Sequence, residues 1–275
     1  MKDISMNYIE AIKTRHSVRT YLRKAISQPH FNGIEAELKR LSADYGTGLT
    51  LLKNSFNGKQ FGTYGIIKNA DAYIVCVCQN ERSALLKAGS ALERAVLHCT
   101  ALGIGTCWLG GTFSREEFSS AISVADGEVI PAVISVGYPG DKEGLIGGLL
   151  RMGAKSKTRM PFETLFFDRD FSQPLSPGDA TAHALELVRI GPSASNKQPW
   201  RVLKDNNGLH FFIEHTPAYA TKYDFDMQLL DLGIAMSHLE LAMRTNGSGG
   251  KWQLRDNNFA ALPPNTEYIE SWVFE

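Results

Sequence analysis

Residues 89–108 read GSALERAVLHCTALGIGTCW, and a second copy of this stretch, GIAMSHLELAMRTNGSGGKW, occupies residues 233–252. Identical residues recur 144 positions later for Gly89, Ala91, Leu97, Gly103, Gly105 and Trp108. The same offset aligns Lys13-Thr14-Arg15 with Lys157-Thr158-Arg159. Two windows that share one offset indicate a gene duplication, so the fold is expected to repeat itself within the chain.

Each copy has the pattern of a strand followed by a helix. Within 84–102, apolar residues recur every three or four positions, which predicts an amphipathic helix that ends at a Gly-x-Gly. Strand candidates precede the two helices at 72–78, AYIVCVC, and at 209–214, LHFFIE, because both are rich in β-branched and aromatic residues. A further strand is predicted over 129–139, VIPAVISVGYP.

Few of these strands are joined in sequence by a single short helix, which favours an α+β sandwich over a doubly wound parallel sheet. We expect two fused, related halves, 1–150 and 151–275, that are intertwined and share an interface like that of a homodimer. The chain would then be a pseudo-dimer. The join is predicted near 145–160, where GLIGGLLRMGAKSK interrupts the pattern.

The composition excludes several classes of protein. The 275 residues are 43% hydrophobic, and 29 basic residues balance 29 acidic ones, which argues against nucleic-acid binding through a general basic field. No apolar run is long enough to cross a bilayer, and the N-terminus lacks the apolar core of a signal peptide. Four cysteines are too few for a disulfide framework. We therefore expect a soluble, cytoplasmic protein that does not bind membranes.

Three segments have the residue types of a ligand site. The segment 15–21, RHSVRTY, offers two arginines and a serine to a phosphate, although a basic helix end would look the same. The loop 191–200, GPSASNKQPW, is more specific, because two prolines fix a backbone that carries several polar side chains; its simpler interpretation is a Ser/Pro-rich turn. In 102–111, LGIGTCWLGG, glycines let backbone N–H groups approach a flat ligand.

Basic residues are concentrated in 1–30 and in 142–160 of this otherwise neutral chain. These two segments either converge on one phosphate or form ordinary solvated surface, and composition alone leaves both interpretations open.

Together with VGYP (136–139) and KTRMP (157–161), the three segments resemble the FMN-dependent nitroreductase family over most of the chain. The resemblance implies a flavin held between two halves. The residues implied for the FMN phosphate are Arg15, Ser17, Lys157 and Arg159, with His16 contributing through its backbone or ring. The residues implied around the isoalloxazine are Arg19, near N1 and O2, and the backbone of Trp108, Leu109 and Gly110, with Pro192, Ser193 and Asn196 closing the other edge.

The chain departs from the usual order of the family. The stretch 51–65, LLKNSFNGKQFGTYG, stands where the Pro-Ser loop is expected and has no Pro-Ser. The second half has the loop but begins KTRMPFETLF, without Arg-x-Ser-x-Arg. Each half lacks what the other retains, so we expect a functional monomer with one intact FMN site and one degenerate site, similar to the duplicated single-chain nitroreductases.

The resemblance also implies the chemistry. The cofactor carries the redox step, so no catalytic side chain and no metal is expected. Hydride from NADH or NADPH would reduce the flavin, and a nitroaromatic, quinone or flavin-type acceptor would then enter the same pocket, which gives ping-pong kinetics. A non-catalytic FMN-binding sensor or reservoir remains an alternative, because duplication with loss of one site permits relaxed function.

Other polar residues receive structural interpretations. Cys76 and Cys78 are expected to be small buried hydrophobes rather than metal ligands. His98 and His238 are expected to be core or interface residues with satisfied ring nitrogens. The acidic group Asp224, Asp226 and Asp231 is expected to mark a solvated helix start.

Overall fold

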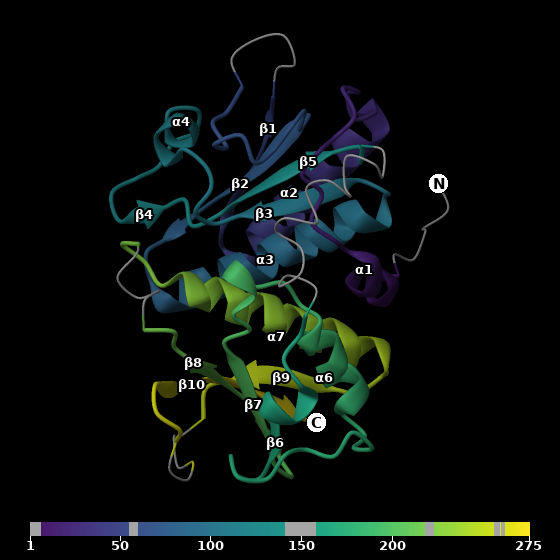
Figure 1. Cartoon of the computed structure of the whole chain (residues 1–275), viewed down its shortest axis with the longest axis vertical. Coiled ribbons are helices and arrows are strands. Elements are labelled where there is room, and N and C mark those ends of the chain that lie inside the picture. Colours follow the sequence, from purple (N-terminus) through teal and green to yellow (C-terminus); the bar gives the residue numbers. More distant parts are fainter. Residues whose placement is uncertain (1–6, 55–59, 141–157, 218–222, 256–258, 260–261) are drawn as a thin grey trace. The chain divides into compact units, whose positions relative to one another are not determined.

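The structure is a computed structural model that describes residues 7–54, 60–140, 158–217, 223–255, 259 and 262–275 (Figure 1). It consists of two units, Met1–Lys155 and Ser156–Glu275, each with its own sheet and helices. The boundary predicted between residues 150 and 151 lies in 141–157, outside the described residues.

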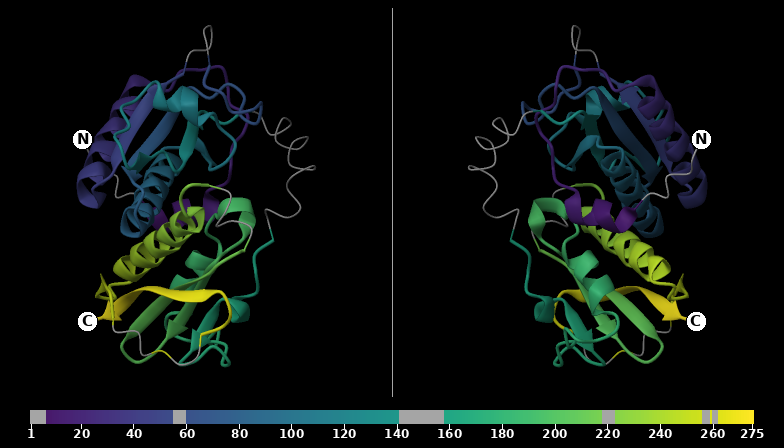
Figure 2. Two further views of the ribbon diagram at one scale, coloured as in Figure 1. Left: turned by 90° about the vertical axis from the view of Figure 1, so that its left-hand side faces the viewer. Right: turned by 90° about the vertical axis from the view of Figure 1, so that its right-hand side faces the viewer.

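In the first unit, two long helices cover one face of an antiparallel sheet (Figure 2). The helix predicted over 84–102 is α3, and its apolar residues Leu85, Leu92 and Val96 are buried. The sheet has the strand order β1-β2-β5-β3, and β4 adds to it by pairing with β2. The elements are α1 (Tyr8–Thr14), α2 (Gln28–Tyr45), β1 (Gly48–Lys53), β2 (Ala72–Gln79), α3 (Arg82–Ala101), β3 (Gly105–Leu109), α4 (Arg115–Ser119), β4 (Glu128–Val129) and β5 (Val133–Gly137).

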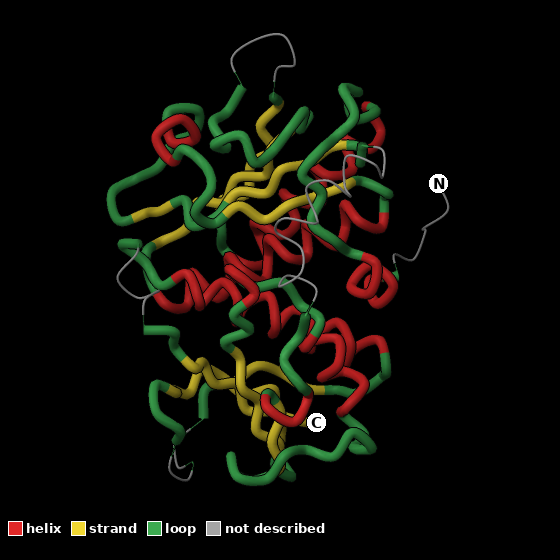
Figure 3. The backbone as a smooth tube through the Cα atoms, viewed as in Figure 1, coloured by secondary structure: helices red, strands yellow, loops and turns green. Residues whose placement is uncertain are grey.

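In the second unit, α6 and α7 pack against each other, and α7 lies along the sheet (Figure 3). The strand order is β6-β7-β8-β10-β9, with β6 and β7 parallel and the other pairs antiparallel. The elements are η1 (Phe162–Thr164), β6 (Phe166–Asp168), α6 (Ala182–Arg189), η2 (Ala194–Asn196), β7 (Trp200–Lys204), β8 (Gly208–Glu214), α7 (Met227–Thr245), β9 (Gly250–Gln253) and β10 (Thr266–Phe274).

The two units repeat one path. From one hydrogen-bonded neighbour to the next, the order β1-β2-β5-β3 in the first sheet corresponds to β7-β8-β10-β9 in the second. The repeated helices α3 and α7 are each followed by a glycine with φ of +72°, Gly103 and Gly247, and then by a strand. This left-handed conformation favours glycine, which explains why both positions keep it. The predicted α+β class with two related halves is confirmed.

The strand predicted over 129–139 is wrong in its extent. It consists of two strands, β4 and β5, which both pair with β2: Val129 lies opposite Cys78, and Val133 lies opposite Val75. Pro131 lies between them and has no amide hydrogen to donate to a neighbouring strand, so the ladder is interrupted there.

The predicted counterpart of the Pro-Ser loop is also wrong. In the second unit the loop 190–199 joins α6 to β7, and its equivalent in the first unit joins α2 to β1. That equivalent is only residues 46–47, whereas residues 51–53 of the stretch 51–65 belong to β1. The first unit therefore lacks the loop because its helix runs almost directly into its strand.

Several sequence interpretations concern single residues outside the site. All four cysteines, Cys76, Cys78, Cys99 and Cys107, are buried and free, which confirms Cys76 and Cys78 as buried residues. Among the described residues, no group of three or more His, Cys, Asp or Glu side chains is arranged to hold a metal ion. In the same part of the chain, no helix has both the length and the apolar character needed to span a bilayer.

Candidate functional site

In the first unit, the segment 15–19 runs beside β3. The amide of Val18 donates a hydrogen bond to the carbonyl of Thr106 at 2.8 Å, and Ser17 and Thr106 form a parallel bridge. Further along, the buried Tyr21 hydroxyl lies 2.8 Å from the Ser135 hydroxyl on β5. This backbone pairing brings the predicted residues Arg15, His16, Ser17 and Arg19 next to the strand that carries Trp108 and Leu109.

Gly105 is required by this close approach. A Cβ atom at position 105 would lie 2.9 Å from Cγ2 of Val18 and 3.1 Å from Cγ of Pro139. Packing of the segment 15–19 against β3 is thus one reason for the Gly-x-Gly, in addition to the ligand approach expected from the sequence.

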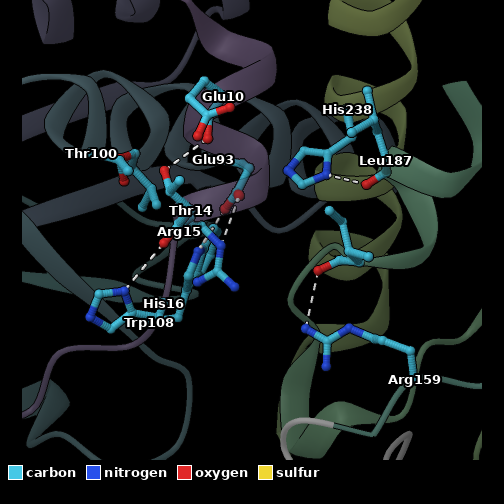
Figure 4. A network of polar contacts seen from close by, with 12 residues as sticks. Glu10, Thr14, Arg15, His16, Glu93, Thr100, Trp108, Arg159, Leu187 and His238 are labelled. Atoms are coloured by element: carbon cyan, nitrogen blue, oxygen red, sulfur yellow. Dashed lines mark hydrogen bonds and ion pairs between the residues drawn. The ribbon is translucent and has the colours of Figure 1, made fainter. Parts of the chain in front are cut away.

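A buried carboxylate joins two of the predicted residues. Glu93 on α3 has no exposed surface, and its Oε2 accepts a hydrogen bond of 2.9 Å from Nε1 of Trp108 (Figure 4). Its Oε1 lies 3.7 Å from Nε of Arg15, whose side chain is 8% exposed. The structure therefore links Arg15 and Trp108 through Glu93.

Glu93 was not among the residues predicted from the sequence. The available signal was its helical position: Glu93 lies four residues after Gly89 and four before Leu97, on the buried face of the amphipathic pattern. A charged residue on such a face is rarely fully buried without a partner.

The other predicted residues of this unit have different surroundings. Nδ1 of His16 lies 3.2 Å from the carbonyl of Thr14 (Figure 4). The Leu109 side chain belongs to the core, so this residue can offer a ligand only its backbone. The carbonyl of Gly110 accepts a hydrogen bond from Nη2 of Arg115 at 2.6 Å, which fixes the loop after β3.

Cys107 on β3 belongs to the hydrophobic core of the first unit. Burial raises the pKa of its thiol, while Arg19, a hydrogen bond with Ser17 and Arg15 act in the opposite direction. The net direction is upward, so the thiol stays protonated at neutral pH. Cys107 is therefore a packing residue of the core.

In the second unit, the loop 190–199 has strained backbone. Ser195, Asn196 and Gln198 have φ values of +50°, +56° and +48°, in the left-handed region that non-glycine residues seldom adopt. Each such residue costs about 1–3 kcal/mol and persists only where surrounding contacts impose it. Strain of this kind is concentrated at functional sites.

Hydrogen bonds hold the strained loop. The Ser193 hydroxyl accepts from the amide of Gln198 at 2.9 Å, and Oε1 of Gln198 accepts from the amide of Met160 at 3.1 Å. Nδ2 of Asn196 donates to the carbonyl of Thr158 at 2.8 Å. The loop is thereby tied to the segment 158–160, and the predicted Ser193 and Asn196 have defined positions next to Pro192.

Arg159 is part of this loop network. Its Nη1 donates to Oδ1 of Asn196 at 3.0 Å, and its Nη2 donates to the carbonyl of Ile190 at 3.1 Å. The structure thus brings together Arg159 and Asn196, which the sequence analysis assigned to opposite parts of the cofactor. The predicted Lys157 lies outside the described residues.

The expectation of a solvated acidic helix start is wrong for Asp231. Asp226 does begin α7, since its side chain accepts from the amide of Gln228 at 2.9 Å. Asp231, however, is buried inside α7, and its Oδ1 accepts from the amide of Ala194 at 2.9 Å. Burial raises the pKa of this carboxyl well above its usual range, and the hydrogen bond from Ala194 is the contact by which Asp231 supports the loop.

The histidines His98 on α3 and His238 on α7 differ in their surroundings. His238 is buried, and its Nδ1 lies 2.8 Å from the carbonyl of Leu187 (Figure 4), which confirms a satisfied core position. The ring nitrogens of His98 have no hydrogen-bond partner among the described residues, so the same expectation is wrong there. Burial lowers the pKa of His98, which keeps the ring neutral.

Comparison with known proteins places these features in a family. The family model described as "Putative TM nitroreductase" matches residues 7–243. A crystal structure of a "putative nitroreductase" from Thermotoga maritima MSB8 has a TM-score of 0.57 and 23% identity, over 98% of this chain and 93% of that chain. A protein of Archaeoglobus fulgidus, "Putative NADH dehydrogenase/NAD(P)H nitroreductase", is 28% identical over 158 residues, which are 49% of this chain and 87% of that protein. The chain is therefore a member of the nitroreductase family that this model defines.

Proposed function

We propose that this chain is a cytoplasmic, FMN-dependent oxidoreductase that uses NADH or NADPH to reduce nitroaromatic, quinone or flavin-type acceptors by ping-pong hydride transfer. Its membership of a nitroreductase family supports an oxidoreductase role. The observation that carries the proposal is the pairing of the segment 15–19 with β3, because it gathers Arg15, Ser17 and Arg19 beside Trp108.

The residues of the first unit fit a phosphorylated ligand. Nε of Arg15 is buried and has no hydrogen-bond partner among the described residues, and a phosphate oxygen would satisfy such a donor. Ser17 adds a hydroxyl two residues further along, and Arg19 adds a second guanidinium. The proposed cofactor-binding residues are Arg15, His16, Ser17, Arg19, Trp108, Leu109 and Gly110 from this unit and Lys157, Arg159, Pro192, Ser193 and Asn196 from the other.

We further propose that the two units pair as a pseudo-dimer in one functional chain, 1–150 with 151–275, and that the strained loop closes the site. Only one site is expected to bind FMN. In the second unit, Trp252 occupies the place of Trp108 in the repeat and packs against Trp272, with ring centroids 5.4 Å apart. In the first copy, Trp108 instead donates to Glu93, which pairs with Arg15. The second copy has a serine, Ser237, at the position of Glu93 and so lacks this carboxylate.

The protein's own groups serve to bind and orient. Bound FMN supplies the two-electron redox chemistry, so no side chain is assigned as a nucleophile or general base. Arg15 and Ser17 would hold the phosphate of FMN, and the positive charge of Arg19 would favour negative charge on its ring. One site that NADH or NADPH and the acceptor would enter in turn is expected to give ping-pong order.

Anaerobic mixing tests this function. The purified chain, loaded with FMN, is mixed with NADH or NADPH in the absence of oxygen, and the visible flavin absorption band is followed. We expect the band to bleach with one of the two nucleotides and to return on addition of a quinone or nitroaromatic acceptor. Bleaching without return would favour the alternative of a flavin-binding sensor or reservoir, and no bleaching would contradict the proposed enzyme.

A further inference from the structure

We propose that Glu93 is a built-in counter-anion of Arg15, with which the phosphate of the cofactor competes. Glu93 would therefore limit how strongly the site prefers FMN to riboflavin, which has the same ring system and no phosphate. This inference rests on the proposed function, because it takes Arg15 as a phosphate-binding residue.

Glu93 forms an ion pair with Arg15 but accepts its hydrogen bond from a different residue, Trp108. Oε2 of Glu93 is anchored by the 2.9 Å hydrogen bond from Trp108. The 3.7 Å between Oε1 and Nε of Arg15 is an ion-pair distance but too long for a hydrogen bond. The carboxylate thus neutralises the Arg15 charge while Nε remains without a hydrogen-bond partner among the described residues.

Burial makes this charge compensation strong. Glu93 has no exposed surface, and 8% of the Arg15 side chain is exposed. Charges removed from water interact more strongly, and a buried charge that loses its partner is strongly destabilising. An entering phosphate finds an arginine that is already neutralised and, at the same time, is repelled by the carboxylate behind it.

The internal repeat supplies a comparison. At the offset of 144, Arg15 corresponds to Arg159 and Glu93 corresponds to Ser237. Arg159 donates to Asn196 and to the Ile190 carbonyl, and the position equivalent to Glu93 holds a serine instead of a carboxylate. The Ser237 hydroxyl is buried and has no hydrogen-bond partner among the described residues. The counter-anion thus exists at one of two equivalent positions, the one beside the segment 15–19.

The variant Glu93→Gln tests the inference. Glutamine keeps the shape and can still accept from Trp108, but it removes the negative charge. Dissociation constants for FMN and riboflavin are measured on flavin-free wild-type and variant chains. We expect the preference for FMN over riboflavin to rise about tenfold or more in the variant, because charges several Å apart in a poorly solvated site interact by that much.

The control is Glu37→Gln, which removes a carboxylate from another ion pair of the same unit, with Arg40 at 2.6 Å. Its preference for FMN should equal that of the wild type. A Glu93→Gln preference that is unchanged or reduced, in a chain whose wild type prefers FMN, would overturn the counter-anion role and leave the proposed function intact. Wild-type protein that binds neither flavin would instead contradict the proposed function, and the inference with it.

A stability comparison decides the case if Glu93→Gln does not fold. Arg15→Gln leaves the buried Glu93 carboxylate without the Arg15 charge, whereas the double variant Arg15→Gln/Glu93→Gln removes both charges. We expect the double variant to melt at a higher temperature than Arg15→Gln alone. A double variant that melts at the same or a lower temperature would contradict the pairing of the two residues.

Discussion

Arg15 and Arg159 occupy equivalent positions in the internal repeat, yet Arg15 pairs with the buried carboxylate of Glu93 and Arg159 donates to the side chain of Asn196. One arginine is held by a helix of its own unit, and the other holds a strained loop. The two copies have therefore diverged in what this position does, while the strand order around it has stayed the same.

Replacing Arg159 with alanine is expected to loosen the loop. Asn196, at φ of +56°, would lose the hydrogen bond to its side-chain oxygen. We expect a loss of about 1–3 kcal/mol in the free energy of unfolding, because two part-buried hydrogen bonds from a charged guanidinium are lost. Urea unfolding gives the free energy, and hydrogen exchange of the amides of 196–198 reports the loop.

The matched control is Arg40→Ala, which removes an exposed arginine that pairs with Glu37 and Asp44. Exposed ion pairs contribute about 0–1 kcal/mol, so the control should cost less and leave the loop amides unchanged. Equal exchange rates of those amides in wild type and Arg159→Ala would disprove the role of Arg159 in the loop.

Gly105→Ala is expected to destabilise the first unit. The new Cβ would lie 2.9 Å from Cγ2 of Val18, so the segment 15–19 must move away from β3. Overpacking of this kind costs about 1–3 kcal/mol, measured by urea unfolding. The control Gly33→Ala in α2 adds a Cβ with nothing within 4 Å and should stabilise by about 0.5–1 kcal/mol. Tolerance of alanine at position 105 would show that packing against Val18 is not what requires glycine.

Trp108→Phe is expected to remove the hydrogen bond that anchors Glu93. A buried acceptor that loses its donor costs about 1–3 kcal/mol, which urea unfolding followed by circular dichroism measures. Trp252→Phe is the control from the second copy, because the described contacts of Trp252 are aromatic ones with Phe211 and Trp272. Equal losses in the two variants would argue against a specific contribution of the Glu93 hydrogen bond.

Asp231→Asn is expected to change the pH dependence of stability. Burial raises the folded-state pKa of Asp231, so the folded state binds a proton that the unfolded state releases above the usual aspartate range. The wild type therefore loses stability as pH rises from about 4 toward the raised pKa. Asparagine does not titrate and can still accept the hydrogen bond from Ala194. The stability of the variant relative to the wild type should therefore increase as pH rises from about 4 toward the raised pKa.

Asp179→Asn provides a control of opposite sign. Burial raises the pKa of Asp179, but hydrogen bonds from Lys204 and Thr181 outweigh it, and the net pKa is lowered. The ionised Asp179 carboxylate therefore stabilises the folded state above the usual aspartate pKa, and this stabilisation is lost as pH falls. Asp179→Asn should reduce stability at neutral pH and have little effect in acid. Urea unfolding across a pH series measures both, and parallel curves for wild type and Asp231→Asn would contradict a raised pKa.

Much of the fold could be predicted from local pattern. The offset of 144 aligns the helices α3 and α7, the glycines Gly103 and Gly247, and the strands that follow them, because helix period and glycine conformation are local properties. The alignment fails before α7, since residues 215–226 separate β8 from α7 while only residues 80–81 separate β2 from α3. Insertions in a loop leave no periodic signal.

The contacts of the candidate site were harder to predict. The motifs identified the loop 191–200 and the segment 15–21, but not the partners Glu93 and Asp231, because a carboxylate on a helix is usually a solvated residue. Burial of these two side chains arises from packing between elements far apart in sequence. The role of Arg159 in holding the loop could not be predicted for the same reason, because it depends on hydrogen bonds to Asn196 and Ile190, which are far away in sequence.

Flavin stoichiometry tests the central claim most directly. Flavin-free protein is titrated with FMN, and the number of FMN molecules bound per 275-residue chain is determined for the wild type and for Arg15→Ala/Lys157→Ala. We predict one FMN per chain for the wild type and loss of binding in a variant that remains folded. Two FMN molecules per chain, none, or full binding by the folded variant would contradict a single site built on the Arg15 segment.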